Sequence, residues 1–247
     1  MNHFFFGTAE RRLFGIYEAA ANSRGERRAA ILCYPWAAEY TFAHRTMRQL
    51  AVKLASAGFH TLRFDYYGTG DSGGEPTDTD LIGWQADIES AIEELTEITG
   101  LARVTLIGMR LGAVVAAAVA SRLRNVVETV VLWDPIISGP EYLKQLGMAT
   151  NGDPPFDVQG FPATERWLLD LAEIDLISSL SKSRSRTLVV VTEDSSSYGQ
   201  LVSSLAGKKT TSIEHHTDAR PWMESSVESG LVPSSVLRRI MNWLDES

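Results

Sequence analysis

A short turn bounded by two glycines places Arg110 at a position that carries the nucleophile in some enzymes. Gly108-Met-Arg110-Leu-Gly112 follows the apolar run 104–107 and opens the alanine- and valine-rich run 110–123, so a strand should pass directly into a helix. The glycines allow a sharp turn, and the central side chain then points out of it. Enzymes that use this turn for nucleophilic attack place serine, cysteine or aspartate at its centre. Arg110 has no nucleophilic atom, because a guanidinium stays protonated at any usable pH.

Four segments of the chain follow predicted strands, in order and well spaced: 34–40, 63–73, 108–112 and 132–139. Together they resemble the α/β-hydrolase superfamily of the serine aminopeptidase type, and more narrowly the exosortase-associated hydrolase-like proteins. The resemblance covers nearly the whole chain. It implies an α/β fold, with a mostly parallel twisted sheet, helices on both faces and a short lid insertion. Because related proteins carry Gly-x-Arg-Leu-Gly at this turn, the resemblance implies that Arg110 is a feature of the subgroup.

The resemblance also assigns roles to residues that follow other strands. The oxyanion hole of the superfamily uses two backbone N–H groups, which correspond here to those of Trp36 and Leu111. Backbone donors do not depend on the side chain, so we expect both residues to contact a ligand. The acid position after the strand 188–191 corresponds best to Asp194, and the alternative acid position after the preceding strand corresponds to Asp134.

The histidine of the superfamily follows the last strand by several residues. This segment reads His215-His216-Thr-Asp-Ala-Arg220-Pro-Trp222. Alignment on the strand end places Arg220, or nearby Trp222, in the histidine position. A shift of two residues would instead make His216 the base. Trp222 is also expected to contact a ligand.

These replacements predict a degenerate triad. Loss of the nucleophile of a triad enzyme costs roughly a millionfold in rate. A buried guanidinium needs a partner, so Arg110 either pairs with Asp134 or Asp194, or binds a ligand carboxylate or phosphate above the helix N-terminus, or exchanges one for the other. We expect a protein that binds a small carboxylated, acylated or phosphorylated ligand in a biosynthetic pathway.

Two other functions stay open. A relocated nucleophile, either Ser72 or one of Ser195, Ser196 and Ser197, would make the chain an esterase, thioesterase or acyltransferase. A purely structural or interaction partner, such as a homodimer formed through an apolar lid face, is the third function. A serine bonded to His216 would favour the second function, and a filled-in site the third.

Alternating strands and helices place these residues at one edge of a sheet. The predicted strands are 4–6, 13–17, 29–34, 61–64, 104–107, 126–133, 188–191 and 210–215, and the predicted helices include 47–58, 81–98, 110–123 and 236–244. The glycine- and proline-containing segment 138–183 breaks this alternation and reads as a lid, so the chain 1–247 is predicted to be one domain with one insertion. Ligands of parallel sheets bind at the carboxyl ends of the strands, below such a lid.

Composition narrows the classes of partner. A chain of 247 residues with 44% hydrophobic residues suits one soluble α/β domain, and a net charge of −8 argues against nucleic acid or an anionic membrane as partner. The single cysteine excludes an internal disulfide. The first residues lack the pattern of a signal peptide, and the apolar stretch 111–120 is too short to cross a bilayer, so we expect a cytoplasmic protein. No cofactor or metal site is predicted.

Overall fold

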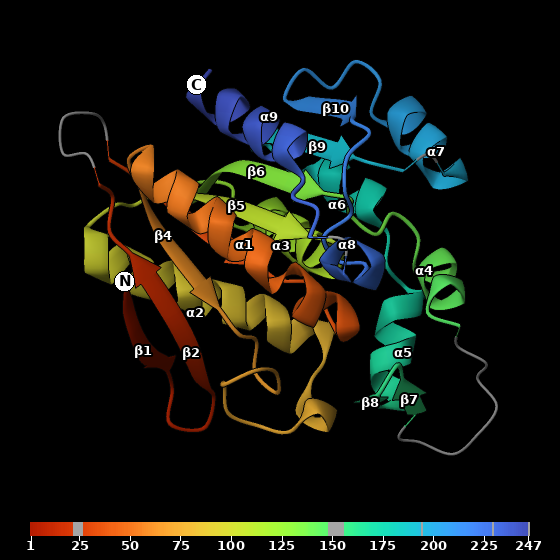
Figure 1. The fold of residues 1–247 in the computed structure, drawn as a ribbon, viewed down its shortest axis with the longest axis horizontal. Coiled ribbons are helices and arrows are strands. Elements are labelled where there is room, and N and C mark those ends of the chain that lie inside the picture. The colour runs from red at the N-terminus through yellow and green to blue at the C-terminus, as the bar shows by residue number, and fades with distance from the viewer. Residues whose placement is uncertain (22–26, 148–155, 194, 229, 247) are drawn as a thin grey trace.

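A computed structural model describes residues 1–21, 27–147, 156–193, 195–228 and 230–246. Within these residues an eight-stranded sheet has the order β1-β2-β4-β3-β5-β6-β9-β10 (Figure 1). Its strands are β1 (Asn2–Gly7), β2 (Arg12–Glu18), β3 (Arg28–Cys33), β4 (Phe59–Phe64), β5 (Val104–Met109), β6 (Val127–Trp133), β9 (Arg186–Val191) and β10 (Thr211–His215). The β1–β2 and β2–β4 pairs are antiparallel and the other pairs are parallel, which confirms the predicted, mostly parallel sheet.

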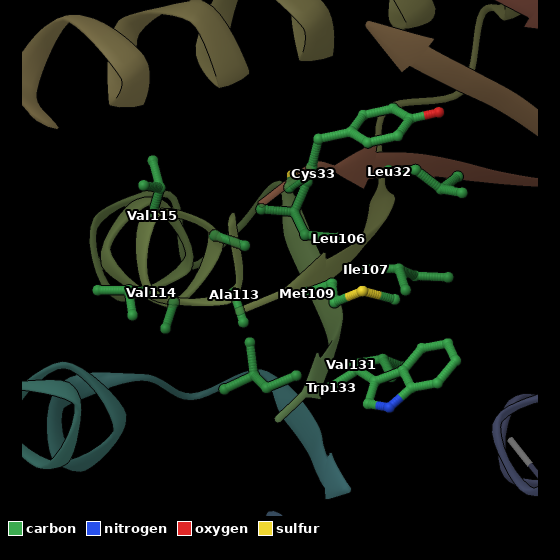
Figure 2. Packing of buried hydrophobic residues seen from close by; sticks show 14 of the residues in the cluster. Leu32, Cys33, Leu106, Ile107, Met109, Ala113, Val114, Val115, Val131 and Trp133 are labelled. Carbon is green, nitrogen blue, oxygen red and sulfur yellow. The ribbon is translucent and has the colours of Figure 1, made fainter. Parts of the chain in front are cut away.

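Helices cover both faces of this sheet, so its central strands are apolar on both sides. The helices α1 (Ala38–Ser56) and α9 (Ser234–Asp245) lie on one face, and α2 (Leu81–Thr99) and α3 (Leu111–Arg122) lie on the other (Figure 1). Every residue of β5 is buried, as expected for a strand inside a two-faced sheet. Figure 2 shows Met109 and Trp133 projecting from the sheet away from α3, whose alanines and valines pack against the strands.

The segment predicted as a lid contains several short elements. These are α4 (Gly139–Gln145), β7 (Phe156–Val158), β8 (Phe161–Ala163), α5 (Glu165–Ala172) and α6 (Leu176–Lys182). The helices α4 and α5 pack together beyond the carboxyl ends of the central strands, whereas α6 packs on α3 (Figure 1). Two further helices follow, α7 (Ser196–Ser204) and α8 (Glu224–Glu228). Among the described helices, none is both long and apolar enough to cross a membrane.

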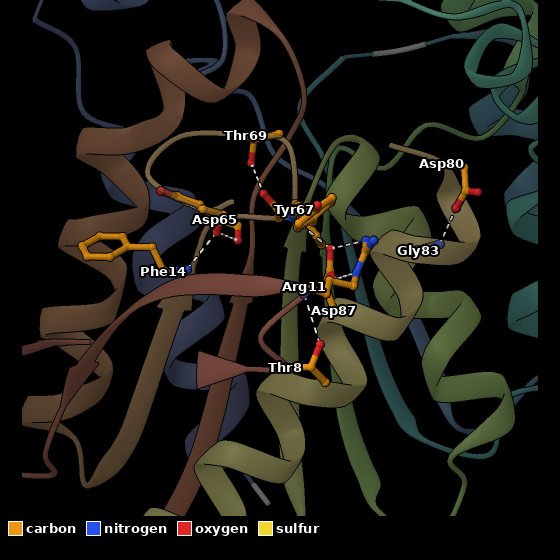
Figure 3. Close-up of polar contacts among 11 residues, drawn as sticks. Thr8, Arg11, Phe14, Asp65, Tyr67, Thr69, Asp80, Gly83 and Asp87 are labelled. Atoms are coloured by element: carbon orange, nitrogen blue, oxygen red, sulfur yellow. Dashed lines mark hydrogen bonds and ion pairs between the residues drawn. The ribbon is translucent and has the colours of Figure 1, made fainter. Parts of the chain in front are cut away.

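A buried ion pair ties the β1–β2 hairpin to α2. Arg11 donates from Nε to Oδ1 of Asp87 at 2.5 Å and from Nη2 to Oδ2 at 3.0 Å (Figure 3). The backbone N–H of Tyr67, in the loop after β4, also donates to Asp87 Oδ2 at 3.0 Å. The Asp87 side chain is fully buried, so these three donors stabilise a carboxylate that has no access to water. The contacts fix the hairpin, the loop and the helix relative to one another.

Close packing of α3 on β3 explains one glycine of the turn motif. A Cβ atom at Gly112 would lie 2.2 Å from the carbonyl oxygen of Tyr34 and 2.3 Å from that of Cys33. Both obstacles are backbone atoms of a central strand and its end, which cannot move aside cheaply. Glycine at this position therefore lets the N-terminus of α3 approach the sheet.

We expect Gly112→Ala to lower the free energy of unfolding by about 2–3 kcal/mol, because the added methyl group overpacks the contact between α3 and β3. Urea denaturation followed by circular dichroism measures the change. The matched control is Gly199→Ala in α7, where an added Cβ meets nothing within 4 Å and helix propensity should raise stability slightly. Equal stability of the Gly112→Ala variant and the wild type would contradict this account of the turn.

Candidate functional site

Arg110 occupies the turn between β5 and α3 in a strained backbone conformation. Its φ is 54° and its ψ is −119°, a region that costs a non-glycine residue about 1–3 kcal/mol. The Arg110 N–H donates to the carbonyl oxygen of Trp133 at 3.0 Å, and the Arg110 carbonyl accepts from the N–H of Ala113 at 3.1 Å. These bonds hold the turn in the geometry that lifts a nucleophile above the sheet. The helix begins at Leu111, one residue later than predicted, because Arg110 itself is not helical.

Within the described residues, the guanidinium of Arg110 has three hydrogen-bond partners. Nε donates to Glu39 Oε1 at 2.9 Å, whereas Nη1 reaches the backbone carbonyl of Asp134 and Nη2 reaches Gln145 Oε1, both at 3.3 Å. The second Glu39 oxygen accepts from the Tyr142 hydroxyl at 3.3 Å. The side chains of Arg110 and Glu39 are only 14% and 13% exposed, so this is a buried ion pair. Pairing with the Asp134 carboxylate, one of the alternatives that the sequence allowed, does not form, because Arg110 bonds to the carbonyl of that residue.

Glu39 is the site residue that sequence reasoning missed. It lies in the first turn of α1, the helix that follows β3. In the sequence, the segment 34–40 indicated the fold but no role for Glu39. Burial raises the pKa of Glu39, while the charge and hydrogen bond of Arg110 act in the opposite direction. Because β3 and β5 are neighbours in the sheet, the element after β3 lies beside the turn after β5. An acidic residue in the segment after β3 is therefore the sequence signal that could have identified Glu39 as a partner of Arg110.

Asp134 lies at the end of β6 and is fixed by Thr192. The Thr192 backbone N–H donates to Asp134 Oδ1 at 2.7 Å, and its hydroxyl donates to Oδ2 at 2.9 Å. The residue is 5% exposed, and burial raises the pKa of the carboxyl to about 6. The other predicted acid, Asp194, lies outside the described residues.

His216 belongs to a polar cluster of its own. Its Nε2 lies 3.0 Å from Glu214 Oε2, and Arg239 contacts both oxygens of the same carboxylate at 2.7 and 2.8 Å. These bonds lower the pKa of Glu214 to about 2. In the described part of the chain, no serine hydroxyl is hydrogen-bonded to His216. The arrangement that would have favoured a relocated serine nucleophile is therefore not present there.

Trp222 is the residue after β10 that faces the turn. Its ring centroid lies 5.4 Å from the Arg110 guanidinium, within the range of a cation–π contact, and the residue is 7% exposed. Arg220 turns to the surface and pairs with Glu193, with 2.6 Å between Nη1 and Oε2. Of the two residues predicted at the histidine position, Trp222 thus lies beside Arg110 and Arg220 does not.

The two predicted oxyanion residues are buried beside the turn. Leu111 is the first residue of α3, and its N–H has no acceptor within the helix. The Trp36 ring packs on Trp167 with 5.2 Å between centroids. Neither residue lines the cavity next to Arg110.

A cavity of about 260 Å³ opens beside the guanidinium at the carboxyl ends of β5, β6 and β9. The polar side chains on its wall include Arg110, Asp134, Glu141, Glu193 and Ser197, and the Trp222 ring closes one side. The Ser197 hydroxyl donates to Glu141 Oε2. The site therefore offers one paired cation, several carboxyl groups and hydroxyl groups. Within the described residues, no cluster of side chains is placed to hold a metal ion.

The raised pKa of Asp134 predicts a pH-dependent gain of stability in Asp134→Asn. The native state holds this proton up to about pH 6 and the unfolded state only to about pH 4, so wild-type stability falls as pH rises through that window. Asparagine stays neutral, so the free energy of unfolding of Asp134→Asn should exceed that of the wild type by up to about 3 kcal/mol above pH 7. Chemical denaturation across pH, with the exposed Glu173→Gln as control, measures the difference. A constant offset at every pH would contradict the assignment.

Comparisons with known proteins agree with this geometry. Residues 37–161, just over half of the chain, match the family model described as "Serine aminopeptidase, S33". No curated protein sequence matches the chain at a significant level.

Solved structures share the fold over almost the whole chain. Est1E from Butyrivibrio proteoclasticus, with ferulic acid bound, has a TM-score of 0.79 at 16% identity, and 98% of each chain is covered. An esterase from Pyrococcus furiosus has a TM-score of 0.70 at 16% identity, covering 99% of this chain and 90% of its own. The enol-lactonase from Burkholderia xenovorans has a TM-score of 0.66 at 15% identity, covering 98% and 99%. With the sheet order, the turn geometry and the family match in agreement, the chain belongs to the S33 serine aminopeptidase family and has the α/β-hydrolase fold.

Proposed function

We propose that this protein binds a small acyl or carboxylated ligand in the cavity beside Arg110 and does not act as a serine hydrolase. One observation carries the proposal. The Arg110–Glu39 pair and the ring of Trp222 fill the places of the nucleophile and its histidine, and a cavity remains next to them.

The chemistry of the turn supports the absence of serine catalysis. Burial by itself would lower the pKa of Arg110, yet Glu39 and the other acidic neighbours keep it above its ordinary value, so the side chain stays protonated and cannot attack. His216 is held in the Glu214–Arg239 cluster. Without both nucleophile and base, only binding and backbone donors are left to accelerate hydrolysis.

The remaining donors of Arg110 support the class of ligand. A guanidinium has five N–H groups, and two of its three hydrogen bonds are long, at 3.3 Å. A ligand oxygen can replace the Gln145 amide at Nη2, helped by the N-terminus of α3 below it. The carboxyl groups of Asp134, Glu141 and Glu193 on the same wall disfavour a doubly charged phosphate. A carboxylate or an acyl carbonyl fits better, and the ferulic acid in Est1E is itself a carboxylic acid.

The proposal extends to the pathway and the assembly of the protein. The Gly108–Gly112 turn is similar to that of exosortase-associated proteins, which supports a role in a biosynthetic pathway. The alternative to a ligand-binding role in a pathway is a homodimer without catalytic function, which a measurement of the oligomeric state would test.

A hydrolase or acyltransferase with a relocated nucleophile is the second candidate, because Ser197 lies in the cavity and donates to Glu141. Ser72 does not support it. The Ser72 hydroxyl donates to the carbonyl of Asp65 and accepts from the N–H of Phe14, so both of its bonds hold a turn. Ser197 therefore lies where it can meet a ligand of Arg110, and Ser195, another of the predicted nucleophiles, lines the same cavity.

We expect no covalent adduct after treatment with a reactive fluorophosphonate, because in the described part of the chain His216, the predicted base, is not hydrogen-bonded to a serine of the cavity. Intact-mass analysis, with an active serine hydrolase labelled alongside, measures this outcome. An adduct mapped to Ser197 would replace the proposal with the second candidate. The Ser197→Ala variant would then lose the label.

The double variant Arg110→Gln/Glu39→Gln should weaken the binding of a monocarboxylate such as hexanoate about tenfold or more, because a charged hydrogen bond contributes about 1.5–3 kcal/mol. Changing both partners avoids a buried unpaired carboxylate. Calorimetric titration measures the affinity, and Arg122→Gln, at the exposed end of α3, is the control that should bind like the wild type. Undiminished binding in the double variant would exclude Arg110 from the ligand site.

A further inference from the structure

A second cavity, of about 390 Å³, lies between the β1–β2 hairpin, the carboxyl end of β4 and the first half of α1. It shares no lining residue with the cavity beside Arg110. Its floor contains the buried side chains of Arg63, Tyr34 and Asp65, and its rim contains the exposed His44. The function proposed above makes no use of this cavity.

Arg63 at the floor lacks most of the acceptors that a buried guanidinium requires. The residue is 2% exposed. Nη1 donates to the Tyr34 hydroxyl at 3.1 Å, but Nη2 lies 3.7 Å from Glu18 Oε1, beyond hydrogen-bond length. Within the described residues, neither Arg63 Nε nor that Glu18 oxygen has a hydrogen-bond partner. Because unsatisfied buried donors are costly, an acceptor supplied from the cavity would stabilise this side chain.

Asp65 does not provide that acceptor. Its Oδ1 accepts from the Tyr40 hydroxyl at 2.7 Å and its Oδ2 accepts from the Asp71 N–H at 3.0 Å. Figure 3 shows Asp65 in the loop after β4, close to Phe14 of β2. The carboxylate is thus engaged by Tyr40 of α1 and by its own loop. Nη2 of Arg63, which has no hydrogen-bond partner among the described residues, stays available to a ligand.

Aromatic rings form the walls of the cavity. Tyr34 stacks on His44 with 5.9 Å between centroids and packs against Tyr40 at 5.2 Å. His3 stacks on Phe14 at 6.2 Å with an interplanar angle of 17°. Walls of this kind favour a flat apolar body over a flexible polar one.

We propose that this cavity binds a small aryl carboxylate, with the carboxylate on Arg63 and the ring against the aromatic walls. The planar fork of a guanidinium matches the two oxygens of a carboxylate. The acidic Asp65 and Asp71 on the same lining disfavour a dianion such as phosphate, so a single negative charge suits the site.

Benzoate tests the proposal on the full chain, by ligand-observed NMR or calorimetric titration. Millimolar affinity is expected for a fragment of this size. Arg63→Gln should weaken binding about tenfold or more, and the neutral analogue benzamide should bind the wild type about tenfold more weakly than benzoate does. Arg110→Gln/Glu39→Gln removes the carboxylate contact proposed beside Arg110, so the benzoate binding that remains in this variant measures the cavity at Arg63, and adding Arg63→Gln to it should weaken that binding about tenfold or more.

A second pair of variants keeps the test valid if Arg63→Gln fails to fold. His44 is exposed at the rim, so His44→Glu and His44→Gln should both fold. Both variants lose the ring that stacks on Tyr34, so only the charge separates them, and His44→Glu should bind benzoate about tenfold more weakly than His44→Gln. Equal binding by these two variants would overturn the proposal. Loss of binding in Arg110→Gln/Glu39→Gln, or no benzoate binding by the wild type, would also overturn it.

Discussion

The candidate site depends on one constraint: a guanidinium that is buried in the protein requires a negatively charged partner there. The strained turn at Arg110 leaves its side chain mostly buried, with 14% exposed. A buried charge without a partner would destabilise the fold by several kcal/mol. Glu39 supplies the partner from the first turn of α1, and Tyr142 and Trp222 enclose the pair. The centre of the turn is therefore occupied by a paired guanidinium.

The same pair ties together elements that are distant in the sequence. Glu39 and Arg110 are separated by 71 residues, and Gln145 reaches the guanidinium from α4 above the sheet. The turn after β5, the start of α1 and α4 therefore share one set of bonds. In enzymes that use this turn for nucleophilic attack, the corresponding elements surround the nucleophile. In this chain they surround the guanidinium of Arg110.

Local sequence was enough to predict the turn and the sheet, but not the partners of Arg110. The strand-to-helix passage at 108–112 is encoded by glycines that the backbone requires, as the 2.2 Å approach at Gly112 shows. Glu39 was missed because its contact depends on β3 lying next to β5, which is a property of the strand order. Spacing after the last strand favoured Arg220 or Trp222 and allowed His216 only with a shift of two residues. Burial separated them, because Trp222 lies beside Arg110 while Arg220 turns to the surface.

Charge balance also limits what the cavity can bind. Glu39 already offsets the charge of Arg110, so a ligand does not need to bring a full counter-charge. The guanidinium can still orient a ligand oxygen, because its hydrogen bonds to Asp134 and Gln145 are long. Around it, Asp134 changes protonation near pH 6 and Glu141 is held by a serine hydroxyl. An acyl carbonyl accepts hydrogen bonds without adding charge to this acidic wall, and for that reason it suits the cavity at least as well as a free carboxylate.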